Sequence, residues 1–287
     1  MTEQLPVDTL TRLVWLLGHP VAHSLSPRMH NAAFQHQGLN LAYVAFDVPP
    51  ECLAAAIAAL RVLGVLGANL TLPHKETALE FLDDIEPLAA KIGAVNTIVN
   101  TDGCLRGYNT DVSGFQMALR SVLPRGAEGL RCLVLGAGGA ARAVIAALAD
   151  DRAACAWLAN RTRQRAVVLC DSAAHWGSTE CRALGLHEVG GVAADADVIV
   201  NATSLGLGDA VKDFPFDVDT LHSGQVVMDL VYATGPTALL RAARQRGAVA
   251  IDGREMLVHQ AACSYQLWTG QRAPIDAMRE SIDSFEG

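Results

Sequence analysis

Short apolar runs alternate with longer segments of helical periodicity along the whole chain. This alternation is typical of βα units packed on a mostly parallel sheet. In the first half the predicted strands are 13–17, 42–46 and 65–70, and the predicted helices are 27–37 and 51–63. The first helix is expected to start with Ser26 as its N-cap and Pro27 at its first position.

The pattern then predicts a hairpin followed by a break in the chain. Residues 94–100 and 104–108 flank Thr101-Asp102-Gly103, which is a tight-turn sequence. Residues 124–129 read Pro-Arg-Gly-Ala-Glu-Gly, and a fresh βαβ series starts directly after them. Its predicted strands are 131–135, 156–158, 198–200 and 226–230, and the terminal helices are 255–268 and 275–285. The fold class is therefore α/β.

Composition narrows the class of protein. A chain of 287 residues suggests about two domains. With 51% hydrophobic and 18% charged residues it is not a disordered chain, and a net charge of −8 argues against a nucleic-acid or acidic membrane partner. We find neither a membrane-spanning run nor the basic start of a signal peptide, so we expect a cytoplasmic protein. The seven cysteines lack a Cys-x-x-Cys pair and are predicted to be reduced, without a metal site.

The strongest motif follows the strand predicted at 131–135. Gly136-Ala-Gly138-Gly-Ala-Ala141 leads from that strand into an Ala-rich helix, which is the context that a dinucleotide fingerprint requires. Gly136 permits the tight turn, Gly138 lets the backbone approach a pyrophosphate, and Ala141 allows close helix packing. The free N–H groups of the helix N-terminus would hold the phosphates.

The next strand end indicates which dinucleotide is bound. An NAD enzyme usually carries Asp or Glu there, but this chain reads Asn160-Arg161-Thr162-Arg163-Gln164-Arg165. Arginines would pair with a ribose 2′-phosphate, whereas an acidic residue would repel it. The alternative is an ordinary solvated helix start, although three cations oppose the macrodipole at that position. We therefore predict NADP(H) as the cofactor.

Four polar clusters interrupt apolar surroundings in the first half and at the hairpin. They are His23-Ser24-Leu25-Ser26-Pro27, Asn69-Leu70-Thr71-Leu72-Pro73-His74-Lys75, Asn96-Thr97 and Asn109-Thr110-Asp111. The first two follow predicted strands, and open α/β sheets place their ligands at strand ends. Each cluster alone could be a helix cap or an ordinary surface group. Together they offer the hydroxyl, amide, ammonium and carboxylate groups that suit a small polyhydroxylated acid.

With these motifs the chain resembles the shikimate dehydrogenase family from about residue 16 to residue 268. The matching motifs are Ser-x-Ser-Pro, Asn-x-Thr-x-Pro-x-Lys, Gly-Ala-x-Asn-Thr, Asn-Thr-Asp, Gly-Ala-Gly-Gly-Ala, Asn-Arg-Thr-x-x-Arg, Asn201-Ala-Thr-Ser204 and Gly253-x-x-Met256-Leu-Val-x-Gln260. The resemblance implies a substrate-binding catalytic domain (1–112 plus 254–287), an NADP-binding Rossmann domain (113–253) and a cleft between them. Val112 and Leu207 depart from the family pattern, and both changes are read as packing variation.

The resemblance also implies roles for individual residues. Lys75 and Asp111 would form the catalytic pair. The residues implied for substrate binding are Ser24, Ser26 and Tyr232 near the carboxylate, and Asn69, Thr71, Asn96 and Gln260 at the ring hydroxyls. The cofactor-binding residues would be Gly136, Ala137, Gly138, Gly139, Ala140, Asn160, Arg161, Thr162 and Arg165, with Leu230 and Gly253 bordering the nicotinamide.

The implied reaction is the reversible, NADPH-dependent reduction of 3-dehydroshikimate to shikimate, a step toward chorismate and the aromatic amino acids. Lys75 would donate the proton to the carbonyl oxygen, or would stabilise its charge while water delivers the proton. His74 is a weaker candidate for proton transfer. A quinate/shikimate dehydrogenase of dual specificity and a non-catalytic cyclic-acid sensor are the alternatives. The expected partner is the small substrate alone, with the chain a monomer or homodimer.

Overall fold

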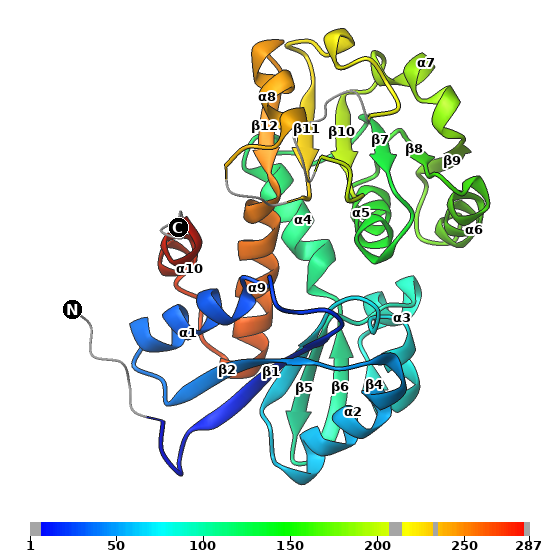
Figure 1. Cartoon of the computed structure of the whole chain (residues 1–287). Coiled ribbons are helices and arrows are strands. Elements are labelled where there is room, and N and C mark those ends of the chain that lie inside the picture. The colour runs from blue at the N-terminus through cyan, green and yellow to red at the C-terminus, as the bar shows by residue number, and fades with distance from the viewer. Residues whose placement is uncertain (1–6, 207–213, 232–234, 284–287) are drawn as a thin grey trace. The chain divides into compact units, whose positions relative to one another are not determined.

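The structure is a computed structural model that describes residues 7–206, 214–231 and 235–283 (Figure 1). The chain divides into two compact units. One unit comprises Met1–Thr110 with Val258–Gly287, and the other comprises Asp111–Leu257. The divisions fall within two helices, α4 (Thr110–Arg120) and α9 (Gly253–Thr269). Each unit contains its own six-stranded sheet.

The sheet of the first unit has the strand order β2-β1-β3-β5-β6-β4. Its strands are β1 (Arg12–Gly18), β2 (Leu41–Asp47), β3 (Gly67–Leu70), β4 (Asp84–Ile85), β5 (Thr97–Thr101) and β6 (Cys104–Tyr108). β1 pairs in parallel with β2 and β3, whereas β5 is antiparallel to both β3 and β6. The predicted hairpin is confirmed, and Asp102 and Gly103 both have positive φ, as a two-residue turn of this hand requires.

Helices of the first unit pack on its sheet or, as α10 does on α1, on one another. They are α1 (Ser26–His36), α2 (Leu53–Val62), α3 (Pro87–Ile92), α10 (Ile275–Asp283) and the later part of α9. α2 contributes Leu53, Ile57 and Leu60 to a core cluster with Trp15 and Leu17 of β1. Apolar residues at i, i+4 and i+7 place those three side chains on one helix face.

The prediction that Ser26 caps α1 is wrong. The N-cap is Leu25, Ser26 is already helical, and no side chain caps this end. Because the helix begins at Ser26 itself, the Ser26 side chain lies one residue beyond the N-cap position.

The second sheet is entirely parallel, with the strand order β12-β11-β10-β7-β8-β9 (Figure 1). Its strands are β7 (Arg131–Leu135), β8 (Cys155–Ala159), β9 (Glu180–Leu184), β10 (Val198–Asn201), β11 (Val226–Asp229) and β12 (Val249–Asp252). The helices within this unit are α5 (Gly139–Asp150), α6 (Arg163–Ala173), α7 (Gly190–Ala193) and α8 (Ala238–Gln245). Numbered from β7, this is the 3-2-1-4-5-6 order of the Rossmann fold, with its crevice between β7 and β10.

The prediction of reduced cysteines is wrong for one pair. Cys170 of α6 and Cys181 of β9 form a disulfide, with their Cα atoms 5.1 Å apart. The packing of α6 against β9 brings the two residues together, and their spacing of 11 residues carries no signal in the sequence. Within the described residues, no helix is both long and apolar enough to span a bilayer.

Candidate active site

The Gly-rich turn between β7 and α5 is shaped by Gly136. Its φ of +107° is one that residues with a side chain rarely adopt. A Cβ at this position would lie 2.7 Å from the carbonyl oxygen of Ala202. The N–H of Gly136 donates to the carbonyl of Ala159, at 2.7 Å. The first glycine of the motif is therefore required by the fold itself.

Gly138 differs from Gly136 in what surrounds it. It is the N-cap of α5, has extended backbone, and offers no side chain to the helix end. A Cβ there would meet no described atom within 4 Å. The fold therefore does not require glycine at 138, whereas a ligand lying close to the backbone would. The first N–H groups of α5 lack helical acceptors and suit an anion.

A cavity of about 330 Å³ lies beside this turn within the second unit. Its lining residues come from the ends of β7, β8 and β10 and from nearby loops: Leu135, Gly136, Ala137, Gly138, Ala159, Asn160, Arg161, Leu186, Ala202, Thr203, Ser204, Leu205 and Pro215. Five of the predicted cofactor-binding residues, namely Gly136, Ala137, Gly138, Asn160 and Arg161, therefore line one cavity. Gly139 and Ala140 begin α5 next to it. Leu186 and Pro215 are lining residues that the sequence analysis missed.

The arginines after β8 differ in their contacts. Arg163 lies with Nε 3.9 Å from Glu188 Oε2. Arg161 and Arg165 are exposed, and neither forms an ion pair within the described parts of the chain. Asn160 donates from Nδ2 to the carbonyl of Thr162, at 3.0 Å, which fixes the start of this segment. Two exposed guanidinium groups, of which that of Arg161 lines the cavity, suit a phosphate ester.

Leu230 and Gly253 lie together in the same unit. A Cβ on Gly253 would be 2.8 Å from the carbonyl carbon and oxygen of Leu230, so the two backbones touch. Only glycine allows this approach.

Two residues named in the sequence analysis lie outside the described residues. They are Tyr232, which the resemblance places near the substrate carboxylate, and Leu207, which departs from the family pattern.

In the first unit, Asn69 at the end of β3 is the centre of a buried polar cluster. Its Nδ2 group lies 3.0 Å from Thr97 Oγ1, 3.1 Å from Ser264 Oγ and 3.0 Å from the carbonyl oxygen of Asn96. Its Oδ1 atom accepts the hydroxyl proton of Tyr43, at 2.8 Å. The amide is thus fixed in orientation, and one lone pair of Oδ1 is left to accept a further hydrogen bond.

Asn96 extends the cluster toward α4 and α9. Its Oδ1 atom accepts from the backbone N–H of Thr110 at 2.7 Å, and its Nδ2 donates to Thr110 Oγ1 at 3.0 Å and lies 3.5 Å from Gln260 Oε1. Asn96, Thr110 and Gln260 are all buried. The predicted residues Asn69, Asn96 and Gln260 are therefore brought into one cluster.

The cluster also contains residues that the sequence analysis did not assign to the site. They are Tyr43, Thr97, Thr110 and Ser264. Ser264 follows Gln260 by four residues on α9, so helical spacing could have placed both on one face. Alternation along β2 places Tyr43 inside but gives no sign that its hydroxyl reaches Asn69.

Ser24 and Ser26 lie at the entry to α1. The Oγ atom of Ser24 accepts from the backbone N–H of Ser26, at 3.3 Å, and Ser26 is buried. Burial raises the pKa of the Tyr43 phenol, so its hydroxyl stays protonated as a donor to Asn69. Tyr43 therefore belongs to the Asn69 cluster as a neutral donor.

Lys75 and Asp111 lie on different elements. Lys75 follows β3, is half-buried, and its backbone carbonyl accepts from the N–H of Val95, at 2.8 Å. Thr71 lies in the same turn and is also half-buried. Asp111 is buried in the first turn of α4.

His74 is buried with Nε2 2.7 Å from the carbonyl oxygen of Val48, which suits a structural role rather than proton transfer.

Comparisons with protein families match three segments of the chain. The family described as shikimate dehydrogenase substrate binding domain matches residues 16–98. The family described as shikimate / quinate 5-dehydrogenase matches residues 119–206, and the shikimate 5′-dehydrogenase C-terminal domain matches residues 253–282.

Whole-chain relatives are also similar. Shikimate dehydrogenase (NADP+) of Moorella thermoacetica is 49% identical over 289 residues, covering 98% of this chain and 97% of the relative. The structure of the Thermus thermophilus shikimate 5-dehydrogenase with NADP(H) and shikimate has a TM-score of 0.82 at 38% identity, covering 94% of this chain and 98% of that one. Quinate dehydrogenase of Corynebacterium glutamicum with NAD has a TM-score of 0.88 at 33% identity, covering 96% and 99%.

Proposed function

The chain belongs to the shikimate dehydrogenase family, and on that premise we propose that it interconverts 3-dehydroshikimate and shikimate with NADP(H). The observation that carries the proposal is the buried cluster around Asn69, Asn96 and Gln260. Such a cluster presents fixed amide and hydroxyl groups, which can hold ring hydroxyls at defined positions. A site built to hydrogen-bond hydroxyls discriminates strongly against molecules that lack them.

We assign substrate binding with catalysis to one unit and cofactor binding to the other. The substrate-binding catalytic part would comprise residues 1–112 plus 254–287, and the NADP-binding part residues 113–253. Six-stranded parallel topology, the Gly136 turn and the adjacent cavity support the second assignment. The polar cluster supports the first.

The cofactor would lie along the β7–α5 turn. The N–H groups of Gly138, Gly139 and Ala140 would hold the pyrophosphate, while Asn160, Thr162 and the guanidinium groups of Arg161 and Arg165 would hold the adenosine ribose and its 2′-phosphate. Leu230 and Gly253 would border the nicotinamide. Bound NADPH supplies the hydride that reduces the ketone.

The chain's own residues would control the proton and the position of the ring. The ammonium of Lys75 would donate a proton to the carbonyl oxygen and stabilise the charge that develops there. The carboxylate of Asp111 would orient that ammonium and accept from a ring hydroxyl. Ser24 and Ser26, with Tyr232, would hold the substrate carboxylate. Thr71 and the remaining Oδ1 lone pair of Asn69 would accept ring hydroxyls.

The decisive assay is oxidation of shikimate and of quinate, each with NADP+ and with NAD+, followed at the nicotinamide absorbance. We expect activity confined to shikimate with NADP+. Comparable turnover of quinate would assign the protein to the dual-specificity enzymes, and no turnover with NADPH binding retained would favour a sensor. The cytoplasmic location and the monomeric or dimeric state stay predictions.

Arginine variants test the cofactor assignment with a control from the same segment. Arg161→Ala with Arg165→Ala should raise the KM for NADP+ by about 10- to 100-fold and leave the KM for NAD+ unchanged, because each phosphate contact is a charge-assisted hydrogen bond. Arg163→Ala should have a much smaller effect, since Arg163 is already close to Glu188. Equal losses for NADP+ and NAD+ would contradict a 2′-phosphate role.

A further inference from the structure

Asp229 is a buried carboxyl group at the carboxyl end of β11, outside the residues assigned so far. It has no exposed surface. One oxygen accepts from Asn201 Nδ2 at 2.8 Å and from the N–H of Val231 at 3.1 Å. The other accepts from the hydroxyl of Thr237 at 2.6 Å. All three partners are uncharged, so this carboxyl group is fixed without a cation.

Asn201 connects Asp229 to the wall of the cofactor cavity. Its Nδ2 also donates to the carbonyl of Leu205 at 2.9 Å. Its Oδ1 accepts from the N–H of Thr203 at 3.1 Å and from the Thr203 hydroxyl at 2.6 Å. The Thr203 oxygen in turn accepts from the N–H of Leu205 at 3.0 Å. Thr203 and Leu205, which line the cavity, are thus both held by a single amide.

Burial raises the pKa of Asp229, but its two oxygens accept three hydrogen bonds, as those of a carboxylate do. In this acceptor form Asp229 decides which way that amide points. A carboxylate can only accept hydrogen bonds, so it requires the NH₂ group of Asn201 on its side. The oxygen of Asn201 must then face Thr203. Reversing the amide would bring an oxygen against the carboxylate and an NH₂ group against the N–H of Thr203. Asp229 therefore selects the one orientation in which Asn201 bonds both Thr203 and Leu205 of the 202–205 loop.

The backbone of Asp229 is fixed at the same place. The next residue, Leu230, donates its N–H to the carbonyl of Asn201, at 2.9 Å. On the other side a Cβ at Gly253 would lie 2.6 Å from the Asp229 carbonyl oxygen. One residue thus joins the 202–205 loop to the Leu230–Gly253 contact, the two parts of this unit that the proposed function places around the cofactor.

We propose that Asp229 is a positioning residue for the dinucleotide: acting through Asn201, it holds the 202–205 wall of the cavity in its binding shape. This inference rests on the proposed use of the cavity by NADP(H). It predicts that loss of the charge weakens cofactor binding and leaves substrate binding unaffected. Loss of a residue that only stabilised the fold would not weaken cofactor binding while sparing substrate binding.

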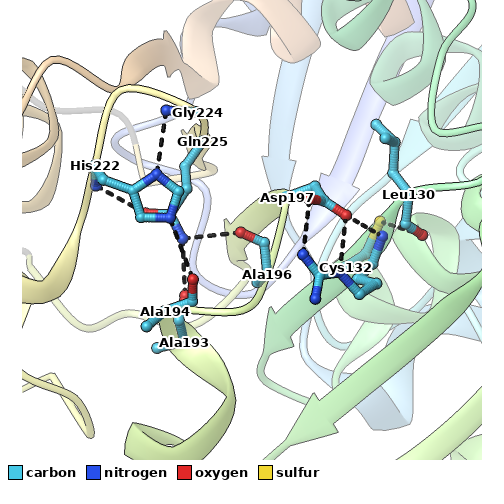
Figure 2. A network of polar contacts seen from close by, with 10 residues as sticks. Leu130, Cys132, Ala193, Ala194, Ala196, Asp197, His222, Gly224 and Gln225 are labelled. Carbon is cyan, nitrogen blue, oxygen red and sulfur yellow. Dashed lines mark hydrogen bonds and ion pairs between the residues drawn. The ribbon is translucent and has the colours of Figure 1, made fainter.

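A second buried network in the same unit provides the control (Figure 2). Gln225 directly precedes β11, whereas Asp229 ends it. Gln225 donates from Nε2 to the carbonyls of Ala193 and Ala196, each at 2.8 Å, and accepts from the N–H of His222 at 3.1 Å. Gln225 is 1% exposed and makes as many hydrogen bonds as Asp229. Its network includes no residue that lines the cavity.

The test compares Asp229→Asn with Gln225→Ala. For each we would measure the NADPH dissociation constant by fluorescence titration, the KM values for NADP+ and shikimate, and unfolding by denaturant. Asp229→Asn should weaken NADPH binding about tenfold, the size of one net hydrogen bond to a charged group, with the shikimate KM within about twofold. Gln225→Ala should lower stability and keep NADPH affinity within about twofold of the wild type. Equal NADPH affinity in the two variants would overturn the proposal.

A milder pair keeps the test valid if Asp229→Asn does not fold. Thr237→Val removes one donor to the carboxylate, and Thr237→Ser retains it. The valine variant should weaken NADPH binding about threefold and the serine variant should restore it. No difference between them would count against the proposal. Failure of the proposed function is separate, because it would appear as absence of shikimate oxidation in the wild type, whereas this inference depends on the ratio of variant to wild-type NADPH affinity.

Discussion

His30 of α1 is a titratable side chain that is fully buried. Its ring stacks on Tyr43 with centroids 4.4 Å apart and lies 5.2 Å from Trp268. Among the described residues, neither ring nitrogen has a hydrogen-bond partner. Burial lowers the pKa of His30 from 6.5 to about 3, so the imidazole is neutral in the folded protein at neutral pH.

Acid should therefore destabilise the protein through His30. Below about pH 6.5 the unfolded chain binds a proton that the folded chain does not, so stability falls as the pH is lowered toward 3, by at most about 1.4 kcal/mol per pH unit. In His30→Leu this contribution should disappear, giving a shallower loss of unfolding free energy between pH 6.5 and 4.5, worth about 2–3 kcal/mol. His36→Gln, at an exposed site on the same helix, is the control. Identical slopes for wild type and His30→Leu would contradict the assignment.

Lys75 is the residue on which the chemistry depends. Lys75→Ala should lower kcat by about 10²- to 10⁴-fold with a modest change in the KM for shikimate, because its contact strengthens as charge develops on the oxygen. Lys91→Ala, which removes an exposed ammonium in α3, should leave both constants unchanged. The kcat and KM values of the two variants decide whether Lys75 acts in catalysis or only in binding. A raised KM with kcat preserved would make Lys75 a binding residue only.

At the scale of elements, the β7–α5 turn has one glycine that the fold requires and one that only a bound ligand would require. Gly136→Ala forces a side chain into a positive φ and against Ala202, and should cost about 2–3 kcal/mol of unfolding free energy. Gly138→Ala has room and extended backbone, and should change stability by less than about 0.5 kcal/mol.

In cofactor binding the order of the two variants should be reversed, with Gly138→Ala the more strongly affected. A methyl group on Gly138 would hold the pyrophosphate off the backbone, so the NADPH affinity of this stably folded variant should fall at least about tenfold. Denaturant unfolding and NADPH titration of both proteins provide the comparison. A Gly138→Ala protein that bound NADPH normally would show that the dinucleotide does not follow this turn.

Long apolar runs and tight-turn sequences could be predicted from the sequence, whereas several short elements and the amphipathic helix α8 were missed. β1 and β7 are long apolar runs and were found within one residue, and the hairpin was given by its Asp102-Gly103 turn. β4 has two residues and α3 has six, too few to show a period, so neither was predicted. The edge strand β9 alternates weakly because its sequence, Glu-Cys-Arg-Ala-Leu, is half polar.

Residues of the site were predictable where they stand in a motif beside a strand end, as Asn69, Asn96 and Gly136 do. Tyr43 and Ser264 were missed because each lies in an apolar periodic segment, where a single polar side chain reads as a core residue. Asp229 was missed for the same reason. Its hydrogen bond to Asn201 connects residues 28 positions apart in the chain, which no local pattern can indicate.

At the scale of the whole molecule, the two units should respond to different ligands. Each unit has its own sheet and its own buried core, so each can open and close its hydrogen bonds independently. A ligand stabilises the structure that binds it, by about 2.7 kcal/mol when present at 100 times its dissociation constant. Backbone amides in that structure should then exchange more slowly with solvent.

Hydrogen exchange followed by mass spectrometry of peptides tests this division. NADP+ alone should slow exchange in peptides covering 135–142, 160–165 and 202–205, and shikimate alone should slow exchange in those covering 24–26, 69–75 and 96–110. Peptides around Gln225 at the far end of β11 report on general stabilisation of the second unit and should change less than the 202–205 loop. Protection by shikimate confined to residues 113–253 would refute the assignment of substrate to the first unit, because a ligand cannot selectively protect a unit that it does not bind.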